Sequence, residues 1–310
     1  MMLDSVLQIV DAQPRRSAIQ RSGDWLATRL AWSVLRWPRW SWVHRFNPRC
    51  PKVGDLLGLH GRCFTVMADD AARLDGLFVP ARREARPRLP VVLAHGIVEV
   101  KELHARRARE LSQRGHDVIL FDTRAHGRST GRHITFGVRE RHDVKAVVDH
   151  AQRQGWIGDR VIAMGMSLGA GTMLQYAAID PRVVGVVAIA PFADMASAVA
   201  SYHRLIAPFL PWSWVCRGFD NACRQAGFAM AEASALEAMA KIKAPLLVVA
   251  AGRDVNLPPA QHAYRLAQAA GCDYCRVLTI DGATHFTLFR HRQPEMDRAV
   301  LAFCARISDI

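Results

Sequence analysis

Short apolar runs alternate with segments of helical periodicity along most of this chain. Runs rich in Val, Ile and Leu predict strands at 91–94, 118–121, 161–164, 183–190, 246–250 and 276–280. Apolar positions at helical spacing predict helices at 100–113, 139–154, 168–179, 260–270 and 294–307. Continuous apolar strands are typical of a sheet that helices cover on both faces. We therefore predict an α/β fold with a mostly parallel sheet flanked by helices.

Two further features complete the predicted fold. Strands at 60–68 and 74–81 precede the alternation and are expected to pair antiparallel, which brings the sheet to eight strands. The interval at about 192–243 is longer than a plain connection between strands. It holds a helix-like piece at 194–206, an apolar Pro/Trp patch at 207–215 and a helical pattern at 229–240. This insertion predicts a small helical lid over the strand ends, and a packed peripheral helix pair is the alternative.

Residues 1–55 form a Trp/Arg-rich segment, predicted as a helical arm ahead of one α/β domain at 56–310 that includes the insertion. A helix is expected at 24–37, with Ser22 or Asp24 near its cap. One face of that helix carries Leu26, Leu30, Val34 and Trp37, and another carries Trp25, Arg29, Trp32 and Arg36. Such a pattern is typical of a peripheral membrane contact, here through residues 22–46, or of a partner-docking arm. The interpretation we favour is a helix packed on its own domain with both faces buried.

The chain is basic, with a formal net charge of +13 over 310 residues. A basic surface attracts nucleic acid, anionic lipid or acidic substrates. The arginines are scattered, however, and no basic helix interleaved with aromatics forms a nucleic-acid motif, so we expect no nucleic-acid partner. The oligomeric state is left open by these features.

Cysteine usage and the chain's start bear on cofactors and location. Seven cysteines include one Cys272-x-x-Cys275 pair with no second pair or histidine at zinc spacing, so neither metal nor another cofactor is expected. Free thiols are typical of a reducing compartment. The first residues lack a secretory signal, and no apolar run approaches the ~20 residues of a spanning helix. We expect a cytoplasmic protein, with peripheral attachment to the inner face of the membrane as a variant of this prediction.

Gly165-Met166-Ser167-Leu168-Gly169 stands between a predicted strand and a predicted helix. This order is what a nucleophile elbow requires, because the tight turn lifts the serine hydroxyl clear of the backbone. Gly165 and Gly169 have no Cβ and so allow strand and helix to approach closely. The sequence therefore predicts Ser167 as a nucleophile, and a Gly/Ser turn without chemistry is the alternative.

A serine nucleophile needs a base, and the base needs an acid to orient it. Asp254 follows the strand at 246–250, and His285 follows the strand at 276–280. Both should lie at the same edge of the sheet as Ser167, and the chain order Ser, Asp, His is that of the nucleophile-elbow fold. Asp194 is the second candidate for the acid. Asp281 precedes a glycine and is read as a turn former.

The tetrahedral oxyanion needs backbone donors as well. The N–H of Leu168 is one candidate, and the N–H of Ile97, after His95-Gly96, is the other. Gly96 permits the turn that this donor requires, and His95 is read as a structural residue that bonds the loop backbone. Three side chains of the loop at 121–129 are expected to brace the site through hydrogen bonds: Asp122, Arg124 and His126.

At these residues the chain resembles the α/β-hydrolase superfamily over roughly 60–305. The motifs are His95-Gly96, Phe121-Asp-x-Arg-x-His-Gly-x-Ser129, Gly165-x-Ser-x-Gly169, Gly252-x-Asp254 with Pro258, and Gly282-x-x-His285. The stretch from 134 to 143 is similar to the branch of serine aminopeptidase-like and monoacylglycerol-lipase-like hydrolases and bacterial esterases. No His-Gly-Gly-Gly run is present, and the elbow carries serine instead of aspartate. These departures argue against the hormone-sensitive-lipase branch and against epoxide hydrolases.

The expected function is that of a serine acyl hydrolase with a small-molecule ester substrate that carries an apolar group. The resemblance implies Ser167 as nucleophile, Asp254 as acid, His285 as base, and Ile97 and Leu168 as oxyanion donors. A thioesterase, an acyltransferase or an aminoacyl peptidase would use the same residues. A non-catalytic membrane-docking or interaction module is the alternative from another class.

Overall fold

The structure is a computed structural model that describes residues 18–36, 61–290 and 293–310. Its centre is an eight-stranded sheet in the order β1-β2-β4-β3-β5-β6-β7-β8. The strands are β1 (Arg62–Met67), β2 (Arg73–Val79), β3 (Arg88–Ala94), β4 (His116–Phe121), β5 (Val161–Met166), β6 (Val183–Ile189), β7 (Leu246–Ala251) and β8 (Cys275–Ile280). Strands β1 and β2 are antiparallel, and β3 to β8 run parallel. The predicted eight-stranded, mostly parallel sheet is confirmed.

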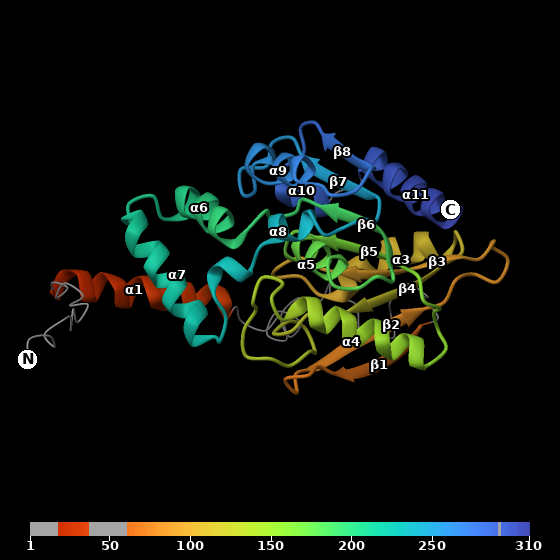
Figure 1. Cartoon of the computed structure of the whole chain (residues 1–310), viewed down its shortest axis with the longest axis horizontal. Coiled ribbons are helices and arrows are strands. Elements are labelled where there is room, and N and C mark those ends of the chain that lie inside the picture. Colours follow the sequence, from red (N-terminus) through yellow and green to blue (C-terminus); the bar gives the residue numbers. More distant parts are fainter. Residues whose placement is uncertain (1–17, 37–60, 291–292) are drawn as a thin grey trace, which may run out of the picture.

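Helices cover both faces of the sheet (Figure 1). One layer comprises α4 (Glu140–Arg153), α5 (Leu168–Ala177), α8 (Ala235–Met239) and α9 (Ala263–Gln268), and the other comprises α3 (Ala105–Ser112) and α11 (Pro294–Ser308). Side chains of β5 alternate between the two layers, since Ala163 packs in one core and Met164 in the other. Burial on both faces explains why the strands read as continuous apolar runs. Short turns of helix, η2 (Lys101–His104), η4 (Pro259–Gln261) and α10 (His285–Arg290), complete this part.

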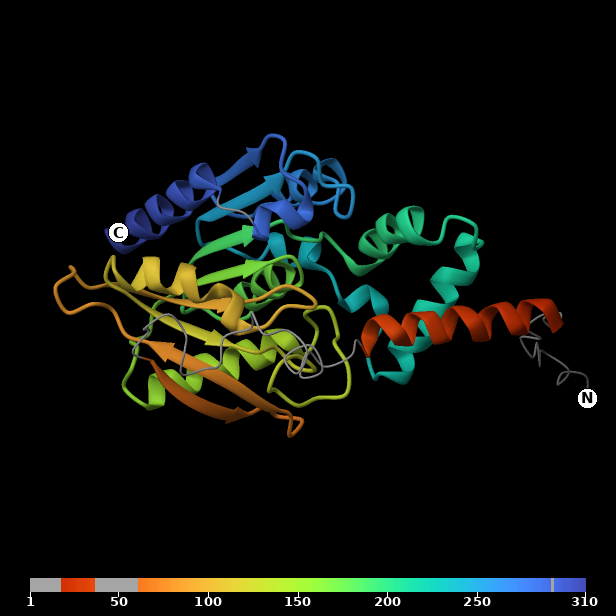
Figure 2. The same ribbon diagram turned by 180° about the vertical axis from the view of Figure 1, so that it is seen from behind.

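A helical cap lies beyond the carboxyl ends of the parallel strands, toward which their arrowheads point (Figures 1 and 2). It contains α6 (Met195–Ile206), α7 (Trp212–Gln225) and η3 (Met230–Glu232). The predicted helix at 229–240 is wrong, because the hydroxyl of Ser234 accepts the N–H of Glu237 and starts the separate helix α8 there. The long second helix is α7, which begins inside the Pro/Trp patch directly after Pro211.

The helix α1 (Ala18–Leu35) packs lengthwise on α7, so the N-terminal segment joins the cap. It begins before the expected cap, and Asp24 lies within the helix, where it accepts a 2.8 Å bond from Arg217. The buried side consists mostly of small or short residues, Gly23, Asp24, Ala27 and Ala31, with Leu35 at its end. The expectation that both large faces are buried is wrong, because small residues let the two helices approach more closely. The predicted boundary at 55/56, Trp37 and the stretch up to 46 lie outside the described residues.

No helix in the described ranges is both long enough and apolar enough to cross a membrane.

The contact between α1 and α7 depends on Gly218. A Cβ at that position would come within 2.5 Å of the backbone carbon of Ala27. We expect Gly218→Ala to weaken this contact by about 1–3 kcal/mol, since the helices must separate to accept a methyl group. Hydrogen exchange of the α1 amides should become faster in this variant. Gly158→Ala is the matched control, because a Cβ there would meet nothing within 4 Å. Unchanged exchange in α1 of Gly218→Ala would contradict the packing described above.

Candidate active site

Ser167 occupies a sharp turn between β5 and α5. Its φ of 50° and ψ of −113° lie in a region that residues with a side chain rarely adopt. The turn is held because the N–H of Ser167 donates to Ile189 O at 2.8 Å, and Ser167 O accepts from the N–H of Gly171 at 3.1 Å. The structure thus stores backbone strain at the serine that the Gly-x-Ser-x-Gly pattern singled out.

The two positions that flank the turn, 165 and 169, have no room for a side chain. A Cβ on Gly165 would lie 2.2 Å from Gly169 O, and a Cβ on Gly169 would lie 2.3 Å from Ala94 O. Both neighbours are backbone atoms, which cannot rotate away as a side chain can. Only glycine at these positions lets α5 start directly on the ends of β3 and β5.

Three buried side chains form a chain of hydrogen bonds over this edge of the sheet. His285 Nε2 lies 3.0 Å from Ser167 Oγ, and His285 Nδ1 lies 2.7 Å from Asp254 Oδ2. Because a carboxylate only accepts, Nδ1 carries the proton and Nε2 is free to accept from the serine hydroxyl. This is the arrangement in which histidine can act as a base toward serine.

The acid and the base are placed by loops that are bonded to each other. Gly252 N donates to Ile280 O at 3.0 Å, and Arg253 N donates to Ala283 O at 2.8 Å, which ties the ends of β7 and β8 together. Asp254 Oδ1 accepts the N–H groups of Asn256 and Leu257 at 2.9 and 2.8 Å. The carboxylate is therefore held at both oxygens.

The other candidate acids lie elsewhere. Asp194 caps α6 by accepting the N–H of Ser197 at 2.7 Å, and its second oxygen pairs with Arg265 at 3.4 Å. Asp281 is exposed and precedes Gly282, whose φ of 76° marks a turn. Of the three carboxylates considered from the sequence, it is Asp254 that contacts His285. His285 itself starts the short helix α10, which the sequence reading did not predict.

The loop after β3 lies directly against Ser167. A Cβ on Gly96 would be 3.4 Å from Ser167 Cβ, and Gly96 O accepts the N–H of Glu99 at 3.3 Å to close a turn. Val98 adopts a φ of 60° within that turn, which is unfavourable for a β-branched residue. Within the described parts of the chain, the N–H groups of Ile97 and Leu168 donate to no protein acceptor. Two backbone donors therefore remain available beside Ser167, as an oxyanion site requires.

His95 braces this loop as a neutral imidazole. Its Nδ1–H donates to Gly96 O at 2.7 Å, and its Nε2 accepts the N–H of Thr123 at 3.0 Å. Complete burial, with a smaller effect of His126, lowers the pKa of His95 to about 3. His126 in turn lies 3.0 Å from Thr123 Oγ1. Both histidines thus form hydrogen bonds within the loops around the site, and it is His285 that contacts Ser167 Oγ.

Glu99 is a site residue that the sequence reading missed. Its Oε2 accepts the N–H of Gly96 at 2.7 Å and lies 3.1 Å from His104 Nε2. Burial alone would raise the pKa of Glu99, but its interactions with His104 and Gly96 lower that pKa to about 2. The sequence did contain a signal for this role, because Glu99 follows Gly96 by three residues. Acidic side chains at that spacing commonly accept a backbone N–H in turns and helix caps.

A second missed residue, Lys101, is buried beneath the same loop. Its ammonium group lies 2.6 Å from Asp75 and 2.7 Å from Asp122, and its backbone N–H donates to Asp122 at 2.9 Å. Asp122 thereby joins the segment after β3 to the loop after β4. Burial alone would lower the pKa of Lys101, but these carboxylates raise it above its ordinary value.

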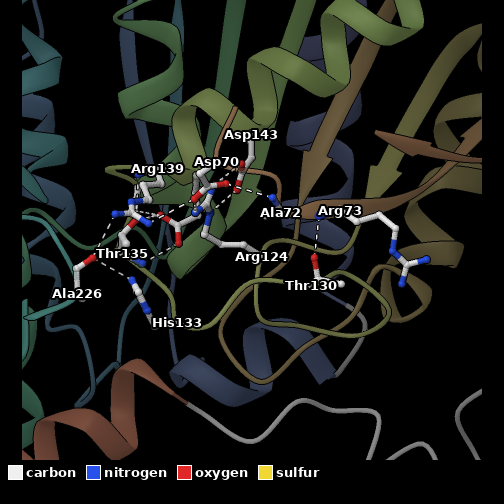
Figure 3. A network of polar contacts seen from close by, with 12 residues as sticks. Asp70, Ala72, Arg73, Arg124, Thr130, His133, Thr135, Arg139, Asp143 and Ala226 are labelled. Carbon is white, nitrogen blue, oxygen red and sulfur yellow. Dashed lines mark hydrogen bonds and ion pairs between the residues drawn. The ribbon is translucent and has the colours of Figure 1, made fainter. Parts of the chain in front are cut away.

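Arg124 connects the loop after β4 to α4 (Figure 3). It makes two bonds to Asp143, at 2.6 and 2.5 Å, and two to Asp70, at 2.7 and 3.4 Å. Arg139, which also reaches Asp70, donates to Ala226 O at 3.2 Å at the end of α7. The network therefore runs from the strand-end loops to the cap. In the residues that the structure describes, no cluster of His, Cys, Asp and Glu is arranged to hold a metal ion.

Residues 85–226 match the family model described as serine aminopeptidase, S33. An uncharacterised protein of Mycobacterium tuberculosis is 27% identical over 226 residues, which cover 73% of this chain and 72% of that protein. A quorum-quenching protein of Acinetobacter baumannii is 30% identical over 122 residues, or 38% of this chain and 40% of that protein.

Two solved structures are similar in fold. An esterase of Pyrococcus furiosus has a TM-score of 0.65 at 20% identity, with 83% of this chain and 96% of the esterase covered. A puromycin-hydrolyzing peptidase of Mycobacterium tuberculosis has a TM-score of 0.63 at 20% identity, with 84% of this chain and 41% of the peptidase covered.

The buried neutral state of His95 makes stability depend on pH. Between the unfolded pKa of 6.5 and the folded pKa of about 3, the unfolded chain binds a proton that the folded chain excludes. The free energy of unfolding should therefore fall as pH falls below 6.5, by about 1.4 kcal/mol per pH unit from this residue. We expect His95→Gln to reduce the slope by roughly that amount, measured by urea unfolding at several pH values. Above pH 7.5 the parent protein and His95→Gln should show the same dependence of unfolding free energy on pH. The same dependence in both proteins at pH 5 would contradict this account.

Proposed function

We propose that this chain is a member of the α/β-hydrolase superfamily and a serine acyl hydrolase that cleaves a carboxylic ester through an acyl-serine intermediate. The fold and the family match support hydrolase activity. The observation that carries the finer proposal is the 3.0 Å contact of His285 Nε2 with Ser167 Oγ, with Asp254 on the far side of the imidazole.

In the first half-reaction, Ser167 Oγ attacks the ester carbonyl while His285 Nε2 takes the hydroxyl proton. The N–H groups of Ile97 and Leu168 stabilise the tetrahedral oxyanion, and Asp254 stabilises the imidazolium. When the intermediate collapses, the bond to the alcohol breaks and His285 gives its proton to that leaving group. Water, deprotonated by His285, then releases the acid and restores the serine.

The apolar surroundings of the nucleophile favour a substrate with an apolar part. Ile97 and Leu168 belong to a cluster that includes Phe192, Val199 and Leu257, of which the first two come from the insertion between β6 and β7. Such a wall binds hydrocarbon by excluding water and offers little to a charged group. Phe192 is held close, because a Cβ on Gly171 would lie 2.1 Å from its ring.

An aminoacyl peptidase is the second candidate, because the matching family model is described as a serine aminopeptidase. A thioesterase or an acyltransferase would differ only in the leaving or accepting group. An interaction module that retains the fold without catalysis is the candidate from another class.

Replacement of the nucleophile gives the direct kinetic test. Ser167→Ala should lower kcat for p-nitrophenyl butyrate by about 10⁴-fold or more, because the acyl-enzyme cannot form. Ser213→Ala, at an exposed position on α7, is the matched control and should leave kcat unchanged. Full turnover by Ser167→Ala would refute the assignment, and an inactive but folded wild-type protein would favour the interaction module.

A substrate comparison separates the hydrolase candidates. We expect kcat/KM for p-nitrophenyl esters to rise with acyl length, since each buried methylene adds about 0.8 kcal/mol of transfer free energy. Thioesters and aminoacyl-naphthylamides of matched size should react more slowly. Faster cleavage of an aminoacyl amide would replace the esterase proposal with the peptidase.

A further inference from the structure

The helix α1 exposes three of its bulky apolar side chains, although Leu35 at its end is fully buried. Its packed side uses Gly23, Ala27 and Ala31, whereas Trp25, Leu26 and Leu30 are 64%, 44% and 45% exposed. An amphipathic helix normally buries its large residues and exposes its small or polar ones. Packing against α7 therefore does not explain why this helix carries tryptophan and leucine on its outer side.

A second group of exposed apolar side chains lies where α6 passes into α7. Ile206, Phe209 and Trp212 are 68%, 80% and 41% exposed, and Leu205 is 50% exposed. The connection itself is well held, because His203 Nε2–H donates to Leu210 O at 2.9 Å and the His203 ring lies 5.3 Å from that of Trp212. These apolar side chains are therefore exposed on a turn whose conformation is held by hydrogen bonding and ring contact.

The N-terminal part of α1 and the turn between α6 and α7 lie on the side of the cap that is away from the sheet (Figures 1 and 2). Helix α1 contacts the first turn of α7, since a Cβ on Gly23 would meet the ring of Trp214 at 2.6 Å. We call this region the cap tip and define it by Trp25, Leu26, Arg29, Leu30, Leu205, Ile206, Phe209 and Trp212. A group of large exposed apolar side chains on one part of a molecule is typical of an interaction site.

The charge of the cap tip is positive. Arg29 lies over the ring of Trp25 at 5.5 Å and Arg36 over that of Trp32 at 4.2 Å, and these four side chains line a groove of about 600 Å³. Residues 195–217 contain no Asp or Glu. In the described stretch 18–36 the single acid is Asp24, which is bonded to Arg217.

We propose that the cap tip docks on the surface of an anionic lipid bilayer. Trp, Phe, Leu and Ile side chains would enter the boundary between headgroups and acyl chains, and the arginines would contact lipid phosphates. A second copy of the chain fits the surface less well, because two such tips would bring like charges together on a protein of net charge +13. The inference is independent of catalysis.

The test is vesicle sedimentation of the full-length Ser167→Ala protein, so that hydrolysis cannot alter the lipid. One set of vesicles is phosphatidylcholine alone, and the other contains phosphatidylglycerol as well. We expect binding to the anionic vesicles that weakens with added salt. Ile206→Ser/Phe209→Ser should reduce the affinity at least about tenfold, because buried hydrocarbon drives insertion. Arg29→Gln/Arg36→Gln should remove most of the preference for anionic vesicles.

Met67→Ser/Ile179→Ser is the matched control, because it changes two other exposed apolar residues outside the cap tip. It should bind as the parent does, and circular dichroism should show that all variants are folded. Equal binding by the Ile206/Phe209 variant and the control would overturn the proposal, as would failure of the parent to bind. Self-association that the Ile206/Phe209 substitutions abolish, without vesicle binding, would assign the surface to a second copy instead.

Discussion

The strained turn at Ser167 is the constraint on which the rest of the site depends. A positive φ at a residue with a side chain persists only where the surroundings enforce it. Here the close approach of Gly169 to the carbonyl oxygens of Ala94 and His95 enforces it, because α5 is pressed against the end of β3. The same approach brings the loop of Gly96 and Ile97 over the serine. One backbone contact thus places both Ser167, the proposed nucleophile, and Ile97, the proposed second oxyanion donor.

Strain of this kind recurs along one edge of the sheet. Val98, Ala125, Ser167 and Ala190 follow β3, β4, β5 and β6, and each has a positive φ. Buried charge-assisted bonds hold the two loops after β3 and β4, with Lys101 on Asp122 and Arg124 on Asp143 as the central pairs. Removing one partner would leave a buried charge uncompensated, which costs more than the pair contributes. These two strained loops are therefore fixed by charges that lie beneath them.

The sequence predicted those parts of the site that depend on local chemistry. A strand that ends in Gly165-x-Ser167, and strands that lead to Asp254 and His285, are visible because each signal lies within a few residues. The sequence ranks Asp254 first and Asp194 second, although both follow strands, and the structure shows Asp254 in contact with His285. Glu99 and Lys101 escaped notice because their roles depend on partners brought in from β2, β4 and η2. Likewise α1 packs on α7 mostly through glycine and alanine, which give no periodic hydrophobic signal. The start of α7 was not recognised because it lies within the Pro/Trp stretch at 207–215.

The central claim is that His285, oriented by Asp254, activates Ser167. Mass spectrometry of the protein quenched during turnover of a slowly deacylating ester tests it most directly. The account predicts an acyl group on the peptide that contains Ser167, and at least about a hundredfold slower acylation in His285→Ala. Acylation of another residue, or an unchanged rate at Ser167 in His285→Ala, would contradict it.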